Sequence, residues 1–314
     1  MDVLPSPTMA MKILCIVGPT ASGKSSRAVE EALKRNGEII SVDSRQVYRG
    51  LSIGTEKITL AEMRGVPHHL INILEAKENY SAGNFVADAT RLIEEITARG
   101  KLPILVGGTH FYFSALLSGL PMGVAANPSL REELEKLSTD ELYARVRTSD
   151  ARRAQELDPQ NRRRLIRALE IIEAKGKVPP RLVNTASFGT RWNLVPKEVE
   201  WIVIDPPHEE LRARIDARLT SALARGLVEE VRRVREEVGD ARLNELGLEY
   251  KIVGEFLRRE NLEVGLPLGS STSKLLLSAL SAKLWQYARR QKAWLRKLHD
   301  ENVISVVSSR PDKN

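Results

Sequence analysis

A glycine-rich loop near the start of the chain constrains the fold more than any other feature. Residues 18–25 read Gly-Pro-Thr-Ala-Ser-Gly-Lys-Ser and match the pattern G-x-x-x-x-G-K-[ST] in full. They follow an apolar run at residues 12–17 and precede a segment with helical spacing. The motif needs this context, because backbone N–H groups and a helix N-terminus must converge on phosphate oxygens. The sequence therefore predicts a strand–loop–helix unit that binds a diphosphate-bearing ligand.

Individual positions of this loop have separate predicted roles. Gly23 lets the backbone approach phosphate oxygens closely, Lys24 adds a full positive charge, and the Ser25 hydroxyl can hold a magnesium ion. The predicted diphosphate contacts are Gly18, Pro19, Thr20, Ala21, Ser22, Gly23, Lys24 and Ser25. The motif does not identify the phosphate compound, and ATP is only its most common ligand.

Strand and helix patterns alternate around this loop. Buried strands are predicted at residues 12–17, 38–42 and 102–106. Helices are predicted from Lys24, with Gly37 as its C-terminal cap, and at residues 85–99. This alternation is typical of a doubly wound parallel sheet, so we expect an α/β fold like that of the P-loop NTPases.

The alternation stops near Pro121, and residues 121–197 contain no convincing strand pattern. Ser138 has capping-box spacing to Glu141, and Asn161 can cap a helix that ends at Gly176. After this region we expect strands at residues 201–204 and 303–307 and helices at 208–237, 250–259 and 273–298. The expected organisation is a P-loop core at residues 11–120 and 198–314, a helical insert at 121–197, and a loose tail at 1–10.

A carboxylate stands at the end of the second predicted strand. Asp43 would lie at the carboxyl edge of the sheet, where open α/β folds bind ligands. It is a candidate magnesium ligand or general base, and the alternative is a helix cap without a chemical role. Gln46 carries the donor and the acceptor that pair with the N6 and N7 groups of adenine.

Two further segments are candidates for phosphate contact. Thr109 follows two glycines after the strand at residues 102–106, although glycines at such places are usually turns. Arg214 and Arg218 share a helical face and could clamp a leaving diphosphate, or they could form a solvated basic face.

Basic residues outnumber acidic ones in the chain, and they are densest in the insert. The chain has 48 Lys and Arg against 41 Asp and Glu, which favours a polyanionic partner such as nucleic acid or reflects a basic surface alone. The densest cluster lies at residues 158–167, where arginines begin a predicted helix against the helix dipole. An RNA backbone would compensate for this charge, and a local ion-pair network is the alternative. Cations and aromatic residues are also mixed along residues 287–296, which suits RNA stacking and phosphate contact. The alternative is that Trp285 and Trp294 are core residues.

Cysteine content and hydropathy indicate the compartment. Cys15 is the only cysteine, so no disulfide can form within the chain and a reducing cytosol is expected. No apolar stretch reaches the roughly 20 residues that span a bilayer. Residues 1–10 lack the features of a signal peptide, and translation could begin at Met9 or Met11. We expect a cytoplasmic monomer without membrane association.

Short motifs run in one order along nearly the whole chain, from Gly18 to Arg296. After the loop they are V-D-S-R-Q-V-Y (42–48), G-V-P-H-H-L (65–70), Y-S-A-G-N-F (80–85), L-V-G-G-T-x-x-Y (105–112), D-P-Q-N-R-R-R-L-I-R-A-L-E (158–170), L-x-x-R-I-x-x-R (211–218), G-L-E-Y-K (247–251) and Q-Y-A-R-R-Q-K-A-W-L-R (286–296). In this series the chain resembles the tRNA dimethylallyltransferases, which prenylate tRNA.

The resemblance implies a role for each group of residues. The loop and Arg218 would hold the diphosphate of dimethylallyl diphosphate together with Mg²⁺. Asp43 would take a proton from the N6 amine of the adenosine on the 3′ side of the anticodon, in the anticodon stem-loop of tRNA. Thr109 and Arg131 would be positioning residues. The implied tRNA contacts are Asp43, Ser44, Arg45, Gln46, Arg131, Gln160, Asn161, Arg162, Arg163, Arg164 and Arg167.

Some residues differ from the family pattern, and three other functions are compatible with parts of the sequence. Leu284 and Trp285 stand where the family usually has Thr-Arg, which puts one phosphate contact in doubt, and Ala222 replaces a methionine. The rivals are a prenyltransferase acting on free AMP, ADP or ATP, a small-molecule P-loop kinase, and a non-catalytic RNA-binding protein. The basic insert argues against a free nucleotide. The D-D-x-x-D motif of chain-elongating prenyl synthases is absent.

Overall fold

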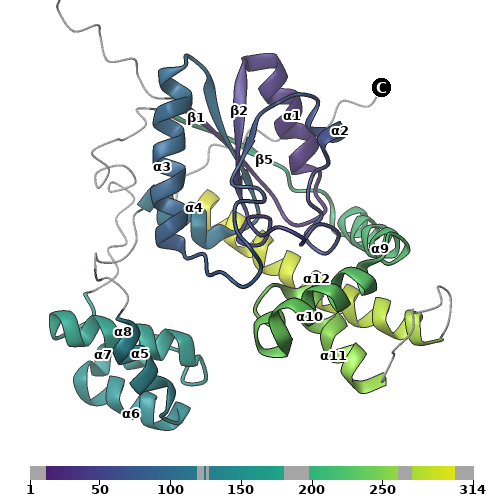
Figure 1. Ribbon diagram of the computed structural model, residues 1–314. Helices are drawn as coiled ribbons and strands as arrows, with labels where there is room; N and C mark the ends of the chain where they lie inside the picture. Colours follow the sequence, from purple (N-terminus) through teal and green to yellow (C-terminus); the bar gives the residue numbers. More distant parts are fainter. Residues whose placement is uncertain (1–11, 119–123, 125–126, 180–197, 261–270, 301–314) are drawn as a thin grey trace, which may run out of the picture. The chain divides into compact units, whose positions relative to one another are not determined.

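The computed structural model describes residues 12–118, 124, 127–179, 198–260 and 271–300. The chain divides into two compact units, one formed by residues 1–119 with 185–314 and a smaller one formed by residues 120–184 (Figure 1). Within the described ranges, no helix is long and apolar enough to cross a membrane.

A five-stranded parallel sheet forms the centre of the larger unit, in the order β3-β2-β4-β1-β5. Its strands are β1 (Lys12–Val17), β2 (Gly37–Val42), β3 (His68–His69), β4 (Leu102–Gly107) and β5 (Glu198–Val203). The predicted parallel sheet and its four longer strands are therefore confirmed. The strand β3 could not be predicted from sequence, because two residues are too few to show a periodic pattern.

The register of the strands brings their carboxyl ends into one row. Val17 of β1 lies opposite Gly107 of β4 and Val203 of β5, and Val42 of β2 also lies opposite Gly107. The segments that leave these strands, including the P-loop (residues 18–25), therefore start at the same edge. This edge is where ligands bind in open α/β sheets.

Both faces of the sheet are buried. Ile13, Cys15 and Val17 belong to the hydrophobic cluster on one face, whereas Leu14 and Ile16 belong to the cluster that includes α1 (Lys24–Arg35) on the other. A strand buried on both faces reads as a continuous apolar run, which is why β1 could be predicted. Cys15 is fully buried, and burial raises the pKa of its thiol, so this cysteine is an unreactive core residue.

Helices surround the sheet and extend beyond its carboxyl edge (Figure 1). Besides α1, those of the larger unit are α2 (Leu60–Met63), α3 (Ala82–Ala98), α4 (His110–Ser118), α9 (His208–Ala224), α10 (Leu227–Leu243), α11 (Leu248–Glu260) and α12 (Ser271–Asp300). The short α2 and the apolar α4 were not predicted.

Three sequence predictions for this unit need correction or cannot be placed. Asn36, rather than Gly37, adopts the left-handed conformation that ends α1, and Gly37 is already the first residue of β2. The single helix predicted at residues 208–237 is two helices, because Gly226 has a φ of 94° and separates α9 from α10. The strand predicted at residues 303–307 lies outside the described residues.

The smaller unit is helical throughout its described part and has its own hydrophobic core. Its helices are α5 (Pro128–Glu135), α6 (Thr139–Ser149), α7 (Ala151–Glu156) and α8 (Arg162–Lys175). Leu142, Val146 and Leu165 are fully buried at its centre. The capping box of Ser138 and the cap of Asn161 are both present, as predicted. These local signals could be read because caps depend on neighbours in sequence.

Candidate active site

The P-loop has the backbone conformation that a phosphate cradle requires. Ala21 and Gly23 have φ angles of 60° and 89°, and Lys24 begins α1 directly after them. Gly18 has no room for a side chain, because a Cβ atom there would lie 2.4 Å from the Ile204 carbonyl oxygen. The predicted strand–loop–helix unit is therefore confirmed, with its loop at the carboxyl edge of the sheet.

Lys24 extends over the loop and is held by the loop itself. Its Nζ donates a hydrogen bond to the Pro19 carbonyl oxygen over 2.6 Å. Burial and the neighbouring Arg218 charge lower the pKa of Lys24 to about 7, and the Asp43 carboxylate opposes part of this shift. A positive group with a depressed pKa in a small cavity is stabilised by an anion, so this lysine is suited to bind diphosphate.

Arginines from α9 reach the P-loop from the side. Arg218 donates to the Thr20 hydroxyl and forms an ion pair with Glu249 over 3.2 Å. Arg214 donates to the Ser22 carbonyl oxygen over 3.2 Å and does not line the cavity described below. Of the two arginines predicted to clamp a diphosphate, Arg218 lines this cavity and Arg214 does not. Glu249, which the sequence analysis did not single out, lies in the G-L-E-Y-K motif.

Asp43 and Thr109 stand at the ends of adjacent strands, β2 and β4. Asp43 Oδ1 accepts the backbone N–H groups of Arg45 (2.8 Å) and Gln46 (3.2 Å), so it caps the turn that follows β2. Its Oδ2 has no hydrogen bond among the described residues and is available for chemistry. Thr109 Oγ1 accepts the N–H of Ser44 over 3.1 Å. Thr109 therefore holds the turn that carries Asp43.

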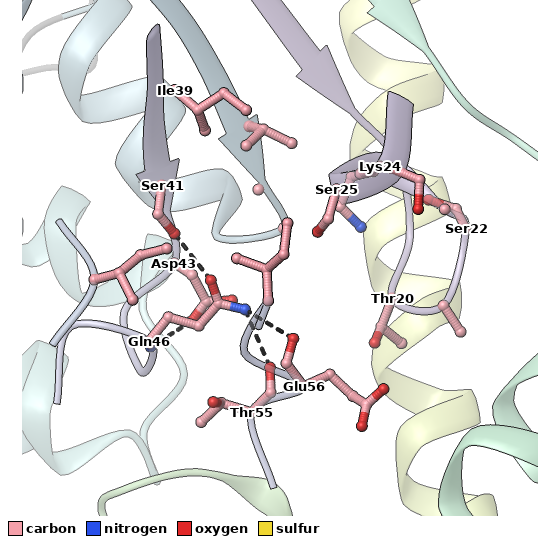
Figure 2. Close-up of a pocket in the computed structure, with 18 of the residues that line it drawn as sticks. Thr20, Ser22, Lys24, Ser25, Ile39, Ser41, Asp43, Gln46, Thr55 and Glu56 are labelled. Carbon is pink, nitrogen blue, oxygen red and sulfur yellow. Dashed lines mark hydrogen bonds between the residues drawn. The ribbon is translucent and has the colours of Figure 1, made fainter. Parts of the chain in front are cut away.

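The Gln46 side chain is already engaged within the protein. Its Nε2 donates to the carbonyl oxygens of Thr55 (3.2 Å) and Glu56 (3.4 Å), and the Ser41 hydroxyl donates to its Oε1 over 3.1 Å (Figure 2). The prediction that Gln46 pairs with both N6 and N7 of adenine therefore needs correction. Its NH₂ group is committed to backbone oxygens, which leaves only Oε1 to face a ligand.

Residues of helix α12 contact three of the loops at this edge of the sheet. These contacts were not predicted from the sequence. Gln291 is 1% exposed, accepts the Thr20 N–H at Oε1 over 2.7 Å, and donates from Nε2 to the Gly108 carbonyl oxygen over 3.0 Å. Lys292 Nζ forms an ion pair with Asp205, after β5, over 2.6 Å. The only sequence signal for Gln291 was its place in the Q-Y-A-R-R-Q-K motif.

One cavity unites these groups. The P-loop residues Thr20 to Ser25 form one wall, and Asp43 and Gln46 lie on the opposite wall (Figure 2). Its other lining residues include Ile39, Ile58, Ile71, Val106, Arg218, Tyr287 and Gln291. Five of the residues predicted for the core site do not line the cavity, namely Gly18, Pro19, Ser44, Arg45 and Thr109. All of them except Gly18 are next in sequence to a residue that does.

The departures from the family pattern occupy packed positions. Leu284 is 1% exposed and Ala222 is 3% exposed, both in the core of the larger unit. Trp285 is partly buried, and the Arg212 guanidinium lies 5.7 Å from its ring centre. Trp285 therefore packs α12 against α9, the helix that carries Arg218.

Arginines of the smaller unit converge on one buried carboxylate. Glu170 is 2% exposed and accepts the Asn127 N–H, two hydrogen bonds from Arg131 (2.8 and 2.9 Å) and one from Arg167 (3.1 Å). Arg162 pairs with Glu135 over 3.0 Å. For Arg162 and Arg167 the structure shows the ion pairs that were the alternative to RNA contact, and Arg131, predicted as a positioning residue, shares Glu170 with Arg167.

The remaining polar residues of the basic segment face solvent. Gln160, Arg163 and Arg164 are exposed at the start of α8. The Asn161 side chain accepts the Arg164 N–H over 3.2 Å and acts as the helix cap. RNA contact stays a prediction for all of these residues, including the exposed Arg163 and Arg164.

Comparison with known proteins places the chain among prenyltransferases. The model of the family described as IPP transferase matches residues 46–298. A tRNA dimethylallyltransferase of Thermomicrobium roseum is 40% identical over 301 residues, which cover 94% of this chain and 86% of that protein. One from a Roseiflexus species is 40% identical and covers 96% of this chain and 94% of its own length.

Solved structures agree with these sequence matches. The tRNA isopentenylpyrophosphate transferase of Bacillus halodurans superposes with a TM-score of 0.62 and 34% identity, over 91% of this chain and 87% of that one. A eukaryotic dimethylallyltransferase described as acting on tRNA superposes with a TM-score of 0.74 and 29% identity, over 93% and 72% of the two chains.

Proposed function

Because this chain belongs to the IPP transferase family, we propose that it is a tRNA dimethylallyltransferase. It transfers the dimethylallyl group of dimethylallyl diphosphate to N6 of the adenosine on the 3′ side of the tRNA anticodon. The observation that carries the proposal is that the P-loop and Asp43 face each other across one shared cavity. A diphosphate on the first wall and an acceptor base on the second would meet in this cavity.

The proposed reaction is a displacement with one proton transfer. Adenine N6 attacks the allylic carbon, the bond from that carbon to the diphosphate oxygen breaks, and diphosphate leaves with the electron pair. Asp43 Oδ2 accepts the proton that N6 loses. Negative charge develops on the diphosphate, so the loop N–H groups, Lys24 and Arg218 act where the charge appears.

Magnesium fits the oxygen donors of the cavity. The Ser25 hydroxyl lies on the P-loop wall, and oxygen donors are the ligands that Mg²⁺ prefers. Within the described ranges, no group of three or more His, Cys, Asp and Glu side chains forms a metal cage. Ser25 would therefore hold the ion together with diphosphate oxygens and water. The bound ion would neutralise charge on the leaving diphosphate.

Aliphatic side chains support a prenyl donor. Ile39, Ile58, Ile71 and Val106 line the same cavity as the P-loop. A hydrocarbon group gains free energy when it leaves water for such a surface. This lining suits the dimethylallyl group, whereas a kinase that transfers a phosphoryl group from ATP has no need for it.

Unpaired cations on α12 support an RNA acceptor. Arg289, Arg290 and Arg296 are exposed and have no ion pair among the described residues. They lie on the helix whose Tyr287 and Gln291 line the cavity. An enzyme acting on free AMP has no use for such a surface, whereas phosphates of an anticodon stem-loop would neutralise it.

Labelling with two acceptors tests the proposal. The protein is incubated with magnesium and labelled dimethylallyl diphosphate, and either tRNA or AMP is added. We expect label in tRNA alone. Label in AMP would favour a nucleotide prenyltransferase, and phosphoryl transfer from ATP to a small molecule would favour a kinase.

We further propose that the protein acts as a monomer in the cytoplasm. Size-exclusion chromatography with light scattering measures the oligomeric state.

Diphosphate binding should depend on pH through Lys24. Its pKa is about 7 in the free loop, and a bound anion would raise it, so binding takes up a proton above that pH. Affinity is then full below pH 7 and should fall by up to about tenfold per pH unit above it. Calorimetry with inorganic diphosphate measures this. In Lys24→Gln the diphosphate itself still titrates, but the decrease of affinity with pH that Lys24 causes should be lost. If affinity falls equally steeply with pH in the variant and the wild type, Lys24 is not the titrating group.

Salt dependence tests the exposed arginines of the insert. Replacing Arg163 and Arg164 with alanine should lower the slope of log Kd for tRNA against log salt concentration by about 0.7–0.9 for each lost phosphate contact. The KM for dimethylallyl diphosphate should not change. A double alanine variant of Arg145 and Arg147, which are exposed on α6, is the charge-matched control. An equal loss of slope in both variants would show a diffuse charge effect instead of contact.

A further inference from the structure

Glu230 of α10 is a buried carboxylate for which the proposed reaction has no use. It is 3% exposed, and its oxygens accept the backbone N–H groups of Ser52 (3.0 Å), Ile53 (2.9 Å) and Gly54 (2.9 Å). The Tyr250 hydroxyl donates a further hydrogen bond over 2.6 Å. A carboxylate is costly to bury, and these four donors are what makes its burial possible.

The bonds to Glu230 determine the shape of the turn at residues 51–56. Three consecutive N–H groups converge on one carboxylate, and the Thr55 hydroxyl closes the turn by donating to the Leu51 carbonyl oxygen over 2.7 Å. A Cβ atom at Gly54 would lie 2.8 Å from the Tyr250 ring, so the turn packs directly on α11. With its N–H groups held on one side, the turn directs the Thr55 and Glu56 carbonyl oxygens at Gln46.

These two carbonyl oxygens decide which way the Gln46 amide points. A carbonyl oxygen can only accept hydrogen bonds, so the NH₂ end of the amide must face Thr55 and Glu56. The Oε1 end is then directed to the other side, where it has one lone pair left beside the Ser41 hydroxyl. Gln46 lies with Asp43 on the wall opposite the P-loop (Figure 2), and Asp43 Oδ2 is also an acceptor without a donor among the described residues.

We propose that Glu230 is a positioning residue that, through the turn at residues 51–56, holds Gln46 as a hydrogen-bond acceptor for the target base. This inference rests on the proposed function. Asp43 and Gln46 then accept one hydrogen each from the exocyclic amine of adenine, which has two to donate. A 6-oxo purine such as hypoxanthine has an oxygen in place of the amine. Its lone pairs would face the acceptor oxygens of Asp43 and Gln46, so we expect the site to reject it.

Loss of the Glu230 charge should release this selection. In Glu230→Gln the new NH₂ group opposes at least one backbone N–H of the turn, so the turn relaxes and the Gln46 amide can rotate. A rotated amide presents its NH₂ group to the amine of adenine. We expect kcat/KM for an anticodon stem-loop to fall by about 10- to 100-fold, and the KM for dimethylallyl diphosphate to stay within about twofold.

A double-mutant cycle on the full chain separates this role from a general loss of stability. If Glu230 acts through Gln46, Glu230→Gln should change kcat/KM by less than about twofold in a Gln46→Ala background. If the two losses simply multiply, the proposal is overturned. Glu229→Gln changes the exposed neighbour on the same helix and should leave all parameters unchanged.

Tyr250→Phe provides a milder second variant if Glu230→Gln does not fold. It removes one donor to Glu230 and keeps the three backbone bonds. We expect kcat/KM to fall by about two- to fivefold, again only when Gln46 is present. An equal loss in the presence and absence of Gln46 would overturn the proposal.

Base discrimination gives a readout that a purely structural role would not change. Stem-loops with adenosine or inosine at the target position compete for binding to the wild type and to Glu230→Gln. We expect the preference for adenosine to shrink by about tenfold in the variant. An unchanged preference would refute the selection mechanism, whereas failure of the wild type to prenylate any tRNA would refute the proposed function instead.

Discussion

Replacing Asp43 with asparagine should lower kcat by about 10²–10⁴-fold and leave diphosphate affinity nearly unchanged. Asparagine keeps the shape of the side chain, and its oxygen can still cap the N–H groups of Arg45 and Gln46. What is lost is the oxygen that takes the proton from N6. Single-turnover kinetics with tRNA and dimethylallyl diphosphate measure the chemical step directly.

Glu56→Gln is the matched control for this variant, since the Glu56 side chain lines the same cavity and only the backbone carbonyl oxygen of Glu56 is assigned to holding Gln46. Its rate should stay close to that of the wild type. Titration of magnesium in the Asp43→Asn protein then distinguishes the two chemical roles of Asp43. If high magnesium restores the rate, Asp43 is a metal ligand and the base lies elsewhere.

Replacing Lys24 with alanine should reduce kcat by at least about 10²–10³-fold while tRNA binding is retained. Lys24 lies over the P-loop, where charge develops on the departing diphosphate, and it does not belong to the exposed basic surfaces. Binding of a labelled anticodon stem-loop and turnover are measured on the same preparation.

Lys34→Ala removes an exposed lysine from the same helix and should change neither property. It controls for the loss of one positive charge from α1. Should Lys24→Ala lose tRNA affinity as strongly as turnover, the separation of the diphosphate wall from the RNA-binding surface would be wrong.

The features that the sequence determined by itself are local ones. The P-loop could be predicted because all of its residues lie within one turn of chain between a strand and a helix. The strand β1 could be read because burial on both faces leaves an uninterrupted apolar run. Asp43 could be predicted as a site residue because it comes directly after such a strand. The helix caps of Ser138 and Asn161 could be predicted from their spacing to the residues that they cap.

The tertiary structure alone decided which partner each polar side chain takes. Arg167 could be an RNA contact or part of an ion-pair network, and only packing of the insert places Glu170 between it and Arg131. Gln291 meets Thr20 across 271 residues of sequence, and Glu230 meets Ser52 across 178. No local pattern encodes such pairs, because they depend on which backbone groups the packed helices leave unsatisfied. For the same reason, the donor and acceptor ends of Gln46 could be told apart only once the turn at residues 51–56 was in place.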